Sequence, residues 1–127
     1  MNIPENLYYT KDHEYVKVEN GIGVIGITDY AQGELGDIIY VDITSEIGNE
    51  IKQHDAVGSI EAVKTVSEVF SPISGKITEI NSGINDNASV LNSDPYGDGW
   101  ILKIEITNSE ELKSLLDAKA YKELVGA

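Results

Sequence analysis

The fold of this chain is decided by one stretch, Val57-Gly58-Ser59-Ile60-Glu61-Ala62-Val63-Lys64-Thr65-Val66-Ser67-Glu68-Val69-Phe70. It is rich in β-branched residues and therefore reads as extended chain. Its 14 residues are too many for one strand of the usual length, about 5–6 residues. The chain should fold back near Lys64, yet no Gly, Pro, Asn or Asp stands there, although turns normally use them. The stretch predicts a β-hairpin whose tip presents a lysine.

The patterns on either side of this stretch predict further short strands. Residues 15–19 and 22–27 should form a hairpin across Asn20-Gly21, a strong type I′ turn signal. More strands are expected over residues 37–43, 76–81 and 100–106, with turns over 48–53 and 71–75. On residues 100–106, alternation places Ile101 on the face opposite Leu102. These segments predict a mainly β protein.

Helices are expected at three places. A short internal helix should lie between residues 28 and 36, capped by Thr28 or Asp29. Near the carboxyl terminus, Asn108 or Ser109 should cap one helix and Asp117 a last one. We therefore expect one β-rich domain over residues 1–127 with C-terminal helices.

Composition excludes several classes of function. The formal net charge is −13, and all nine basic residues are lysines. Such a surface repels phosphate backbones and anionic lipids, so we expect neither a nucleic-acid partner nor a membrane partner. The chain has no cysteine, which excludes disulfides and a thiol nucleophile. The first residues resemble no signal peptide, which predicts a cytoplasmic protein.

Three patterns look chemical but favour structural roles. Residues 21–26 match a dinucleotide-binding fingerprint, but a strand runs through them where the motif needs a helix start. Residues 94–99 with Glu105 resemble part of a calcium loop, but Tyr96 occupies a ligand place. His13 and His54 are far apart in the sequence. We expect no catalytic residue and no metal site, and any chemistry must come from an attached group.

Residues 61–68, followed by residues 71–76, closely resemble the lipoylation segment of the glycine cleavage system H proteins. Further blocks agree in order and spacing, at residues 13–16, 26–37 and 92–100. The last of these blocks is typical of H proteins, whereas the lysine segment is shared in outline with all lipoyl and biotinyl domains. Two positions depart from the family pattern, Tyr15 where tryptophan is usual and Asp12 where a small residue is usual.

The resemblance implies a lipoyl/biotinyl-like barrel-sandwich hybrid with lipoic acid in amide linkage to Lys64. It also implies that Glu61, Val63 and Thr65 are read by a lipoate ligase or lipoyl/octanoyl transferase. The expected function is non-catalytic. The arm would carry an aminomethyl group from the glycine decarboxylase (P protein) to the aminomethyltransferase (T protein), and electrons to dihydrolipoamide dehydrogenase (L protein). By the same resemblance we expect a monomer from a bacterial cytoplasm.

The family also implies a cleft beside the hairpin that protects the loaded arm. A cationic amine requires carboxylates, and Glu14 and Glu68 are the expected partners. Asp12 would add a third carboxylate, since alternate residues of a strand share a face.

Two alternatives stay open from the sequence. One is a lipoyl or biotinyl domain of a large acyltransferase or carboxylase. Biotinyl domains favour methionine beside the lysine, whereas Val63 and Thr65 flank Lys64 here. The other is an H-protein fold that relays lipoate to other complexes, which can coexist with glycine cleavage.

Overall fold

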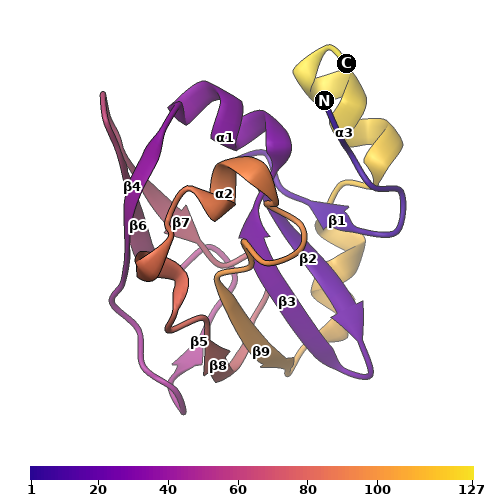
Figure 1. Ribbon diagram of the computed structural model, residues 1–127. Coiled ribbons are helices and arrows are strands. Elements are labelled where there is room, and N and C mark those ends of the chain that lie inside the picture. Colours follow the sequence, from indigo (N-terminus) through magenta and orange to yellow (C-terminus); the bar gives the residue numbers. More distant parts are fainter.

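The computed structural model describes residues 1–127, which form two antiparallel sheets (Figure 1). The larger sheet has six strands in the spatial order β1 (Tyr8–Tyr9), β2 (Glu14–Glu19), β3 (Ile22–Ile27), β9 (Leu102–Ile106), β8 (Gly75–Ile80) and β5 (Glu50–Ile51). The smaller sheet has the order β4 (Ile38–Ile43), β6 (Ala56–Ala62) and β7 (Val66–Phe70). This arrangement confirms the predicted barrel-sandwich hybrid.

The main hydrophobic core lies between the sheets. Alternate residues of each strand point inward, as the period of two in a strand requires. Val41 and Ile60 come from the smaller sheet, and Ile25, Leu102 and Ile104 from the larger one, and all are buried. The core therefore joins the lysine hairpin to the rest of the chain.

The glycines of residues 21–26 are explained by packing in a hairpin. Asn20 and Gly21 have φ values of 50° and 80°, as a type I′ turn between β2 and β3 needs. A Cβ on Gly23 would lie 2.9 Å from Val16 Cγ2, and one on Gly26 would lie 2.6 Å from the Tyr15 hydroxyl oxygen. The hairpin prediction is confirmed, and the fingerprint is part of strand β3.

The predicted helix caps are present. Thr28 caps α1 (Asp29–Leu35) by accepting a hydrogen bond from the Ala31 N–H. Asn108 caps η2 (Ser109–Ser114), which is a 3₁₀ helix, and Asp117 caps α3 (Ala118–Val125). Two further short helices, η1 (Ile84–Asp86) and α2 (Val90–Ser93), were not predicted from the sequence.

Two local predictions were wrong. The expected turn over residues 48–53 contains strand β5, because Glu50 and Ile51 pair with Lys76 and Gly75 of β8. Ile101 is buried although alternation placed it opposite Leu102. It precedes strand β9, and its N–H donates to the Ile25 carbonyl at 2.8 Å, so strand alternation does not apply to it.

Loop 94–99 is closed by its own polar groups. The Asp94 carboxylate accepts from the Asp98 N–H at 2.9 Å, and the Gly99 N–H donates to the Asp94 carbonyl at 2.9 Å. The carboxylate that a calcium loop would need as a ligand instead stabilises the loop.

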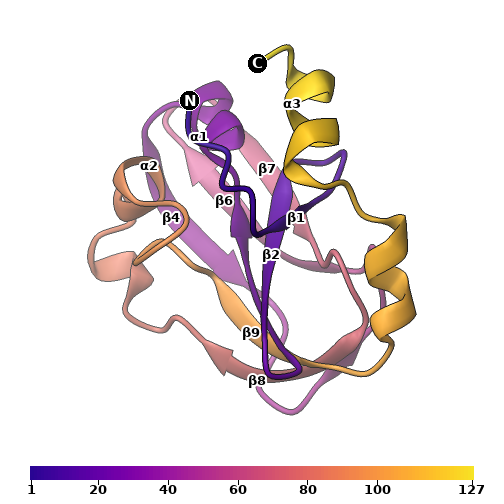
Figure 2. The same cartoon turned by 90° about the vertical axis from the view of Figure 1, so that its right-hand side faces the viewer.

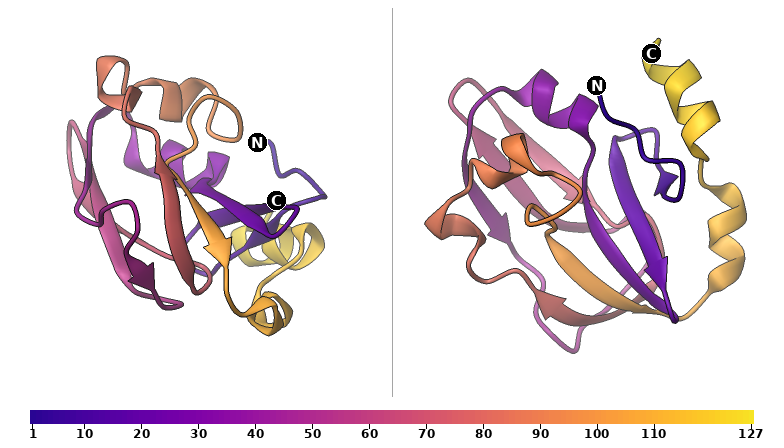
Figure 3. Two further views of the ribbon diagram at one scale, coloured as in Figure 1. Left: turned by 90° about the horizontal axis from the view of Figure 1, so that it is seen from below. Right: turned by 45° about the vertical axis from the view of Figure 1, so that its right-hand side comes forward.

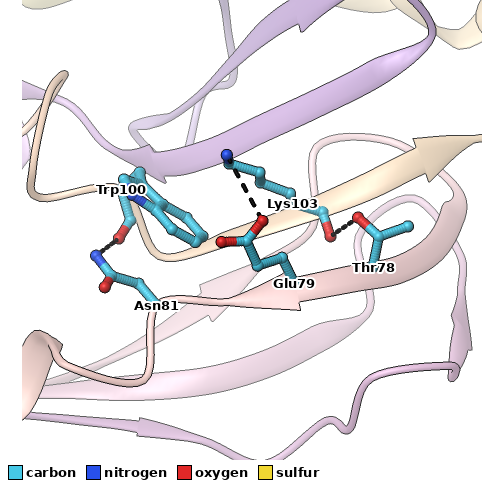
Figure 4. A network of polar contacts seen from close by, with 5 residues as sticks. All are labelled: Thr78, Glu79, Asn81, Trp100 and Lys103. Carbon is cyan, nitrogen blue, oxygen red and sulfur yellow. Dashed lines mark hydrogen bonds and ion pairs between the residues drawn. The ribbon is translucent and has the colours of Figure 1, made fainter.

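A polar network fastens β8 to β9 (Figure 4). Lys103 Nζ lies 4.9 Å from the Trp100 ring centroid and 3.7 Å from the Glu79 carboxylate. Asn81 donates to the Trp100 carbonyl at 2.8 Å, and Thr78 donates to the Lys103 carbonyl at 3.3 Å. These residues lie on β8 and β9 of the larger sheet or next to the ends of these strands, so the network is separate from the lysine hairpin. No helix of the structure is long and apolar enough to cross a lipid bilayer.

Candidate functional site

The lysine hairpin has the predicted form. Strands β6 and β7 pair from Ala56–Phe70 to Glu61–Val66, and residues 63–65 between the two strands form the tip. The Ala62 N–H closes the turn by donating to the Thr65 carbonyl at 2.8 Å, and the Val63 N–H donates to the Asp37 carbonyl at 3.0 Å. The turn is thus tied to the chain just ahead of β4, and it needs no glycine because none of residues 63–65 has a positive φ.

Lys64 is exposed at this tip, and its side chain lies against the end of α1. A Cβ built on Gly36 would stand 3.3 Å from Lys64 Cε and 3.7 Å from Nζ. Figure 3 (right) shows the hairpin tip and the carboxyl end of α1 at the same end of the molecule. The Lys64 amine is therefore accessible to another protein, and the Lys64 side chain packs beside the carboxyl end of α1.

The residues around the tip form an exposed surface. Val63 is 72% exposed, and Glu61 and Thr65 are also exposed. Glu61 lies between Tyr40 on β4 and Val66 on β7 in the strand register. Both neighbours are exposed apolar residues, and sequence reasoning did not single them out.

A cavity of about 130 Å³ lies beside the hairpin, between α1, the start of β2 and β7. Its lining consists of apolar and acidic side chains, with few other polar groups. The apolar residues are Ile27, Ala31, Leu35, Ile60 and Val69; the polar ones are Asp12, His13, Glu14, Glu34, Ser67 and Glu68. We call this cavity the acidic cleft. All three carboxylates expected from the sequence border it.

Glu14 is the buried carboxylate of the acidic cleft, with only 2% of its surface exposed. Its Oε1 accepts a hydrogen bond from the Thr10 hydroxyl at 2.7 Å. Burial raises the pKa of Glu14 to about 7, and the charge of Asp12 adds to the rise. The Thr10 hydrogen bond acts in the opposite direction. Glu14 is therefore poised to change its charge near neutral pH.

Asp12 borders the acidic cleft for a reason other than the predicted one. Strand β2 begins at Glu14, and Asp12 lies in the turn before it, so the expectation of a shared strand face was wrong. His13 intervenes with φ of 69°, a left-handed conformation that turns the chain.

Glu68 and Ser67 both border the acidic cleft, but strand alternation separates them. Ser67 pairs with Ile60, whose side chain is buried, so Ser67 belongs to the inward row of β7. Glu68 pairs with Ser59 and is exposed. Sequence reasoning missed Ser67 and also Glu34, although Glu34 follows Ala31 by one turn of α1.

The two histidines lie at different cavities. His13 borders the acidic cleft, whereas His54 borders a cavity of about 450 Å³ with Lys11, Gln53 and Leu115, and Asp12 borders both. No cluster of three or more His, Cys, Asp or Glu side chains is arranged to hold a metal ion.

A barrel-sandwich hybrid with an exposed lysine at a hairpin tip, next to a small acidic cleft, defines a carrier domain for a covalently attached group. The sequence profile of the Glycine cleavage H-protein family matches residues 7–127. The chain therefore belongs to the glycine cleavage H-protein family. Members of this family are non-catalytic lipoyl carriers of the glycine cleavage system, and they bear lipoic acid on a lysine.

Individual relatives agree with this assignment. The chain is 48% identical over 120 residues to the glycine cleavage system H protein of Symbiobacterium thermophilum, covering 94% of this chain and 93% of that one. It is 49% identical over 124 residues to that of Salinibacter ruber, covering 98% and 99%. The crystal structure of a glycine cleavage system H protein from Mycobacterium marinum superposes with a TM-score of 0.88 at 32% identity, covering 98% and 100% of the two chains.

The family identity sets the partners. As a lipoyl carrier of the glycine cleavage system, the protein interacts with the P, T and L proteins. It shuttles the aminomethyl group from P to T and electrons to L.

Proposed function

We propose that Lys64 is the lysine that bears the lipoyl group and that residues 1–127 act as one lipoyl-carrier domain. The observation that carries this proposal is the exposed amine at a tip that two backbone hydrogen bonds hold in place. Gly36 leaves room along α1 for the root of the arm, so the residues present fit the group. When attached, lipoic acid supplies a dithiolane that accepts electrons and a carbon fragment through sulfur.

Intact mass of protein purified from its native host tests the attachment. We expect a mass gain of one lipoyl group, mapped to Lys64 by peptide sequencing. A lipoyl group mapped to any of the other eight lysines would overturn the proposal.

We propose further that the acidic cleft holds the ammonium of the aminomethyl cargo, with Glu14 as the main partner and Asp12 and Glu68 as additional carboxylates. Support comes from the burial of Glu14 and from the size of the cavity, which suits a group as small as methylammonium. A cation beside Glu14 favours its ionised form, and exclusion of water slows hydrolysis of the cargo.

The test is the rate at which the aminomethyl-loaded protein loses its cargo. Glu14→Gln should accelerate the loss most, because Glu14 is buried, and Glu68→Gln and Asp12→Asn should act less. The matched control is Glu79→Gln, which lies in the β8–β9 network outside the cleft. Loss at the wild-type rate in Glu14→Gln and Glu68→Gln, with normal lipoylation, would contradict the assignment.

The proposal for the modifying enzyme rests on the residues at the hairpin tip. A lipoate ligase or lipoyl/octanoyl transferase would read Glu61, Val63 and Thr65, which surround the amine and are exposed. The net charge of −13 makes copies of the protein repel each other, which favours a monomer. We place this work in the bacterial cytoplasm.

A further inference from the structure

The C-terminal segment contacts a residue that borders the acidic cleft, because Tyr121 of α3 lies within hydrogen-bond distance of His13. Tyr121 is fully buried, and its ring stacks on Tyr9 with centroids 4.6 Å apart and an interplanar angle of 10°. Tyr9 and Leu116 exchange two backbone hydrogen bonds of 2.8 Å, which fasten the segment to β1. Figures 1 and 2 show α3 beside β1, at the end where both termini lie.

The Tyr121 hydroxyl joins three elements. It lies 2.6 Å from Thr28 Oγ1, which caps α1, and 2.9 Å from His13 Nδ1. His13 borders the acidic cleft, and its ring meets that of Tyr121 edge to face at 5.7 Å. One hydroxyl therefore connects α3 with the start of α1 and with the turn that precedes Glu14.

That turn has a backbone that needs support from outside. His13 has φ of 69°, which is uncommon for a residue other than glycine. Its N–H donates to the Thr10 carbonyl at 3.2 Å, and its carbonyl accepts from the Thr28 N–H at 3.0 Å. Thr10 in turn donates to the Glu14 carboxylate. A shift of His13 would therefore move the residues that orient Glu14.

We propose that Tyr121 is a positioning residue for the acidic cleft, holding His13 and thereby the Thr10–Glu14 turn in place. This inference rests on the proposed role of the cleft. It gives the C-terminal helix a function in protecting the cargo, in addition to its packing on β1. Lys64 lies on a different element, so attachment of lipoate should not depend on Tyr121.

The hydrogen bond between the Tyr121 hydroxyl and His13 Nδ1 also affects which ring nitrogen of His13 carries the proton. Burial lowers the pKa of His13, against the charges of Asp12 and Glu34, and so favours the neutral ring, in which one nitrogen carries a proton and the other accepts. A hydrogen bond between Nδ1 and the Tyr121 hydroxyl favours one tautomer. Removing the hydroxyl should change the tautomer balance, which the ¹⁵N shifts of the ring report directly.

The first experiment is ¹⁵N NMR of the two histidines in wild type and Tyr121→Phe. The His13 ring resonances should move by more than those of His54, which borders a second cavity that Tyr9, Thr10 and Asp12 also line. The matched control is Tyr15→Phe, which removes a buried hydroxyl bonded to the Pro95 carbonyl at 2.6 Å. In that control the His13 resonances should stay in place. Unmoved His13 resonances in Tyr121→Phe would overturn the proposal.

The second experiment measures cargo loss from the aminomethyl-loaded proteins. Tyr121→Phe should lose its cargo roughly three- to tenfold faster than wild type, the change expected from weakening one hydrogen-bonded link. Tyr15→Phe should lose it at the wild-type rate, and lipoylation should be normal in both. If Glu14→Gln accelerates the loss and Tyr121→Phe does not, the positioning role fails and the cleft proposal stands. If neither accelerates it, the cleft proposal fails as well.

A third variant keeps the test valid should Tyr121→Phe not fold. Site-specific 3-fluorotyrosine at position 121 keeps the hydroxyl and the ring packing but makes the phenol more acidic. The His13 Nδ1 resonance should then shift by more than that of His54. An unchanged His13 resonance would count against the link.

Discussion

Lys64 and Gly36 share the space at the carboxyl end of α1, where a Cβ on Gly36 would stand 3.3 Å from Lys64 Cε. Gly36 has φ of 77° and ψ of −154°, a region that is essentially restricted to glycine. Helix α1 also supplies Ala31, Glu34 and Leu35 to the acidic cleft. The end of α1 thus connects the root of the arm with the cleft in which the cargo would rest.

Gly36→Ala should therefore destabilise the protein and slow its lipoylation. We expect a loss of about 1–3 kcal/mol in the free energy of unfolding from backbone strain, measured by denaturant titration. Lipoylation, followed by intact mass over time, should slow because the methyl group crowds Lys64.

The control is Gly33→Ala in the same helix, where a Cβ meets nothing within 4 Å. That change should stabilise by roughly 0.5–1 kcal/mol and leave lipoylation unchanged. A Gly36→Ala protein lipoylated as fast as wild type would contradict the shared space.

Lys64→Arg should abolish carrier activity and leave the fold intact. Arginine keeps the positive charge, but a ligase that forms an amide on a lysine amine has no acceptor there. Because Lys64 is exposed, the free energy of unfolding should change by no more than about 0.5 kcal/mol. Glycine decarboxylation with the P protein is the assay, and Lys76→Arg, another exposed lysine, is the control. Wild-type turnover by Lys64→Arg would show that the lipoyl group is carried elsewhere.

Glu14 should make stability depend on pH. Its pKa is raised from 4.5 in the unfolded chain to about 7 in the folded protein. The stabilising contribution of the protonated group is therefore fully present below pH 4.5 and is lost as pH rises through 7. Glutamine is uncharged at every pH, so Glu14→Gln should exceed wild type at pH 8 by on the order of 3 kcal/mol. The two proteins should converge at pH 4, in denaturant titrations across this range.

The control for this experiment is Glu123→Gln, an exposed position on α3. Its stability should follow wild type at every pH. If the difference between Glu14→Gln and wild type were the same at pH 4 and pH 8, Glu14 would not bind its proton more tightly in the folded protein.

The parts of the fold that could be predicted depend on local pattern. The Lys64 hairpin follows from a β-branched stretch too long for one strand, and the β2–β3 hairpin follows from Asn20-Gly21. The caps Thr28, Asn108 and Asp117 act within three residues of their own position. In each case the interaction that decides the structure lies within a few residues of its signal.

The parts that could not be predicted depend on contacts between distant residues. Tyr121 and His13 are 108 residues apart, and no periodic pattern in either segment points to the other. Strand β5 consists of two residues and exists only because β8 offers a partner. Asp12 reaches the acidic cleft through the left-handed backbone of His13, not through strand alternation. Such features follow from the three-dimensional arrangement of the elements, which the local sequence does not encode.

Inserting one glycine between Val63 and Lys64 should sharply reduce lipoylation without unfolding the protein. The tip has only three residues, and hydrogen bonds at Ala62 and Val63 fix its geometry. One added residue rotates Lys64 away from the tip and changes the register of one arm. Intact mass after incubation with ligase measures modification, and circular dichroism checks the fold.

A glycine inserted between Gly48 and Asn49, in a turn away from the hairpin, is the control. Normal modification of the Val63–Lys64 insertion would show that the ligase reads only the local sequence.

Association with the P protein should weaken with salt, and the acids near the tip should contribute most. A surface with a net charge of −13 steers encounter with a basic patch, and this attraction is screened over a Debye length of about 8 Å at physiological ionic strength.

The double change Asp37→Asn with Glu61→Gln removes two exposed acids beside Lys64, and Glu46→Gln with Glu50→Gln removes two exposed acids away from the hairpin. The apparent affinity of each protein should be measured at low and at physiological ionic strength. Because the P protein must act on the arm at the tip, the first pair should reduce the salt dependence more than the second. Equal effects of the two pairs would mean that only net charge matters, and no salt dependence in wild type would mean that docking is mainly apolar.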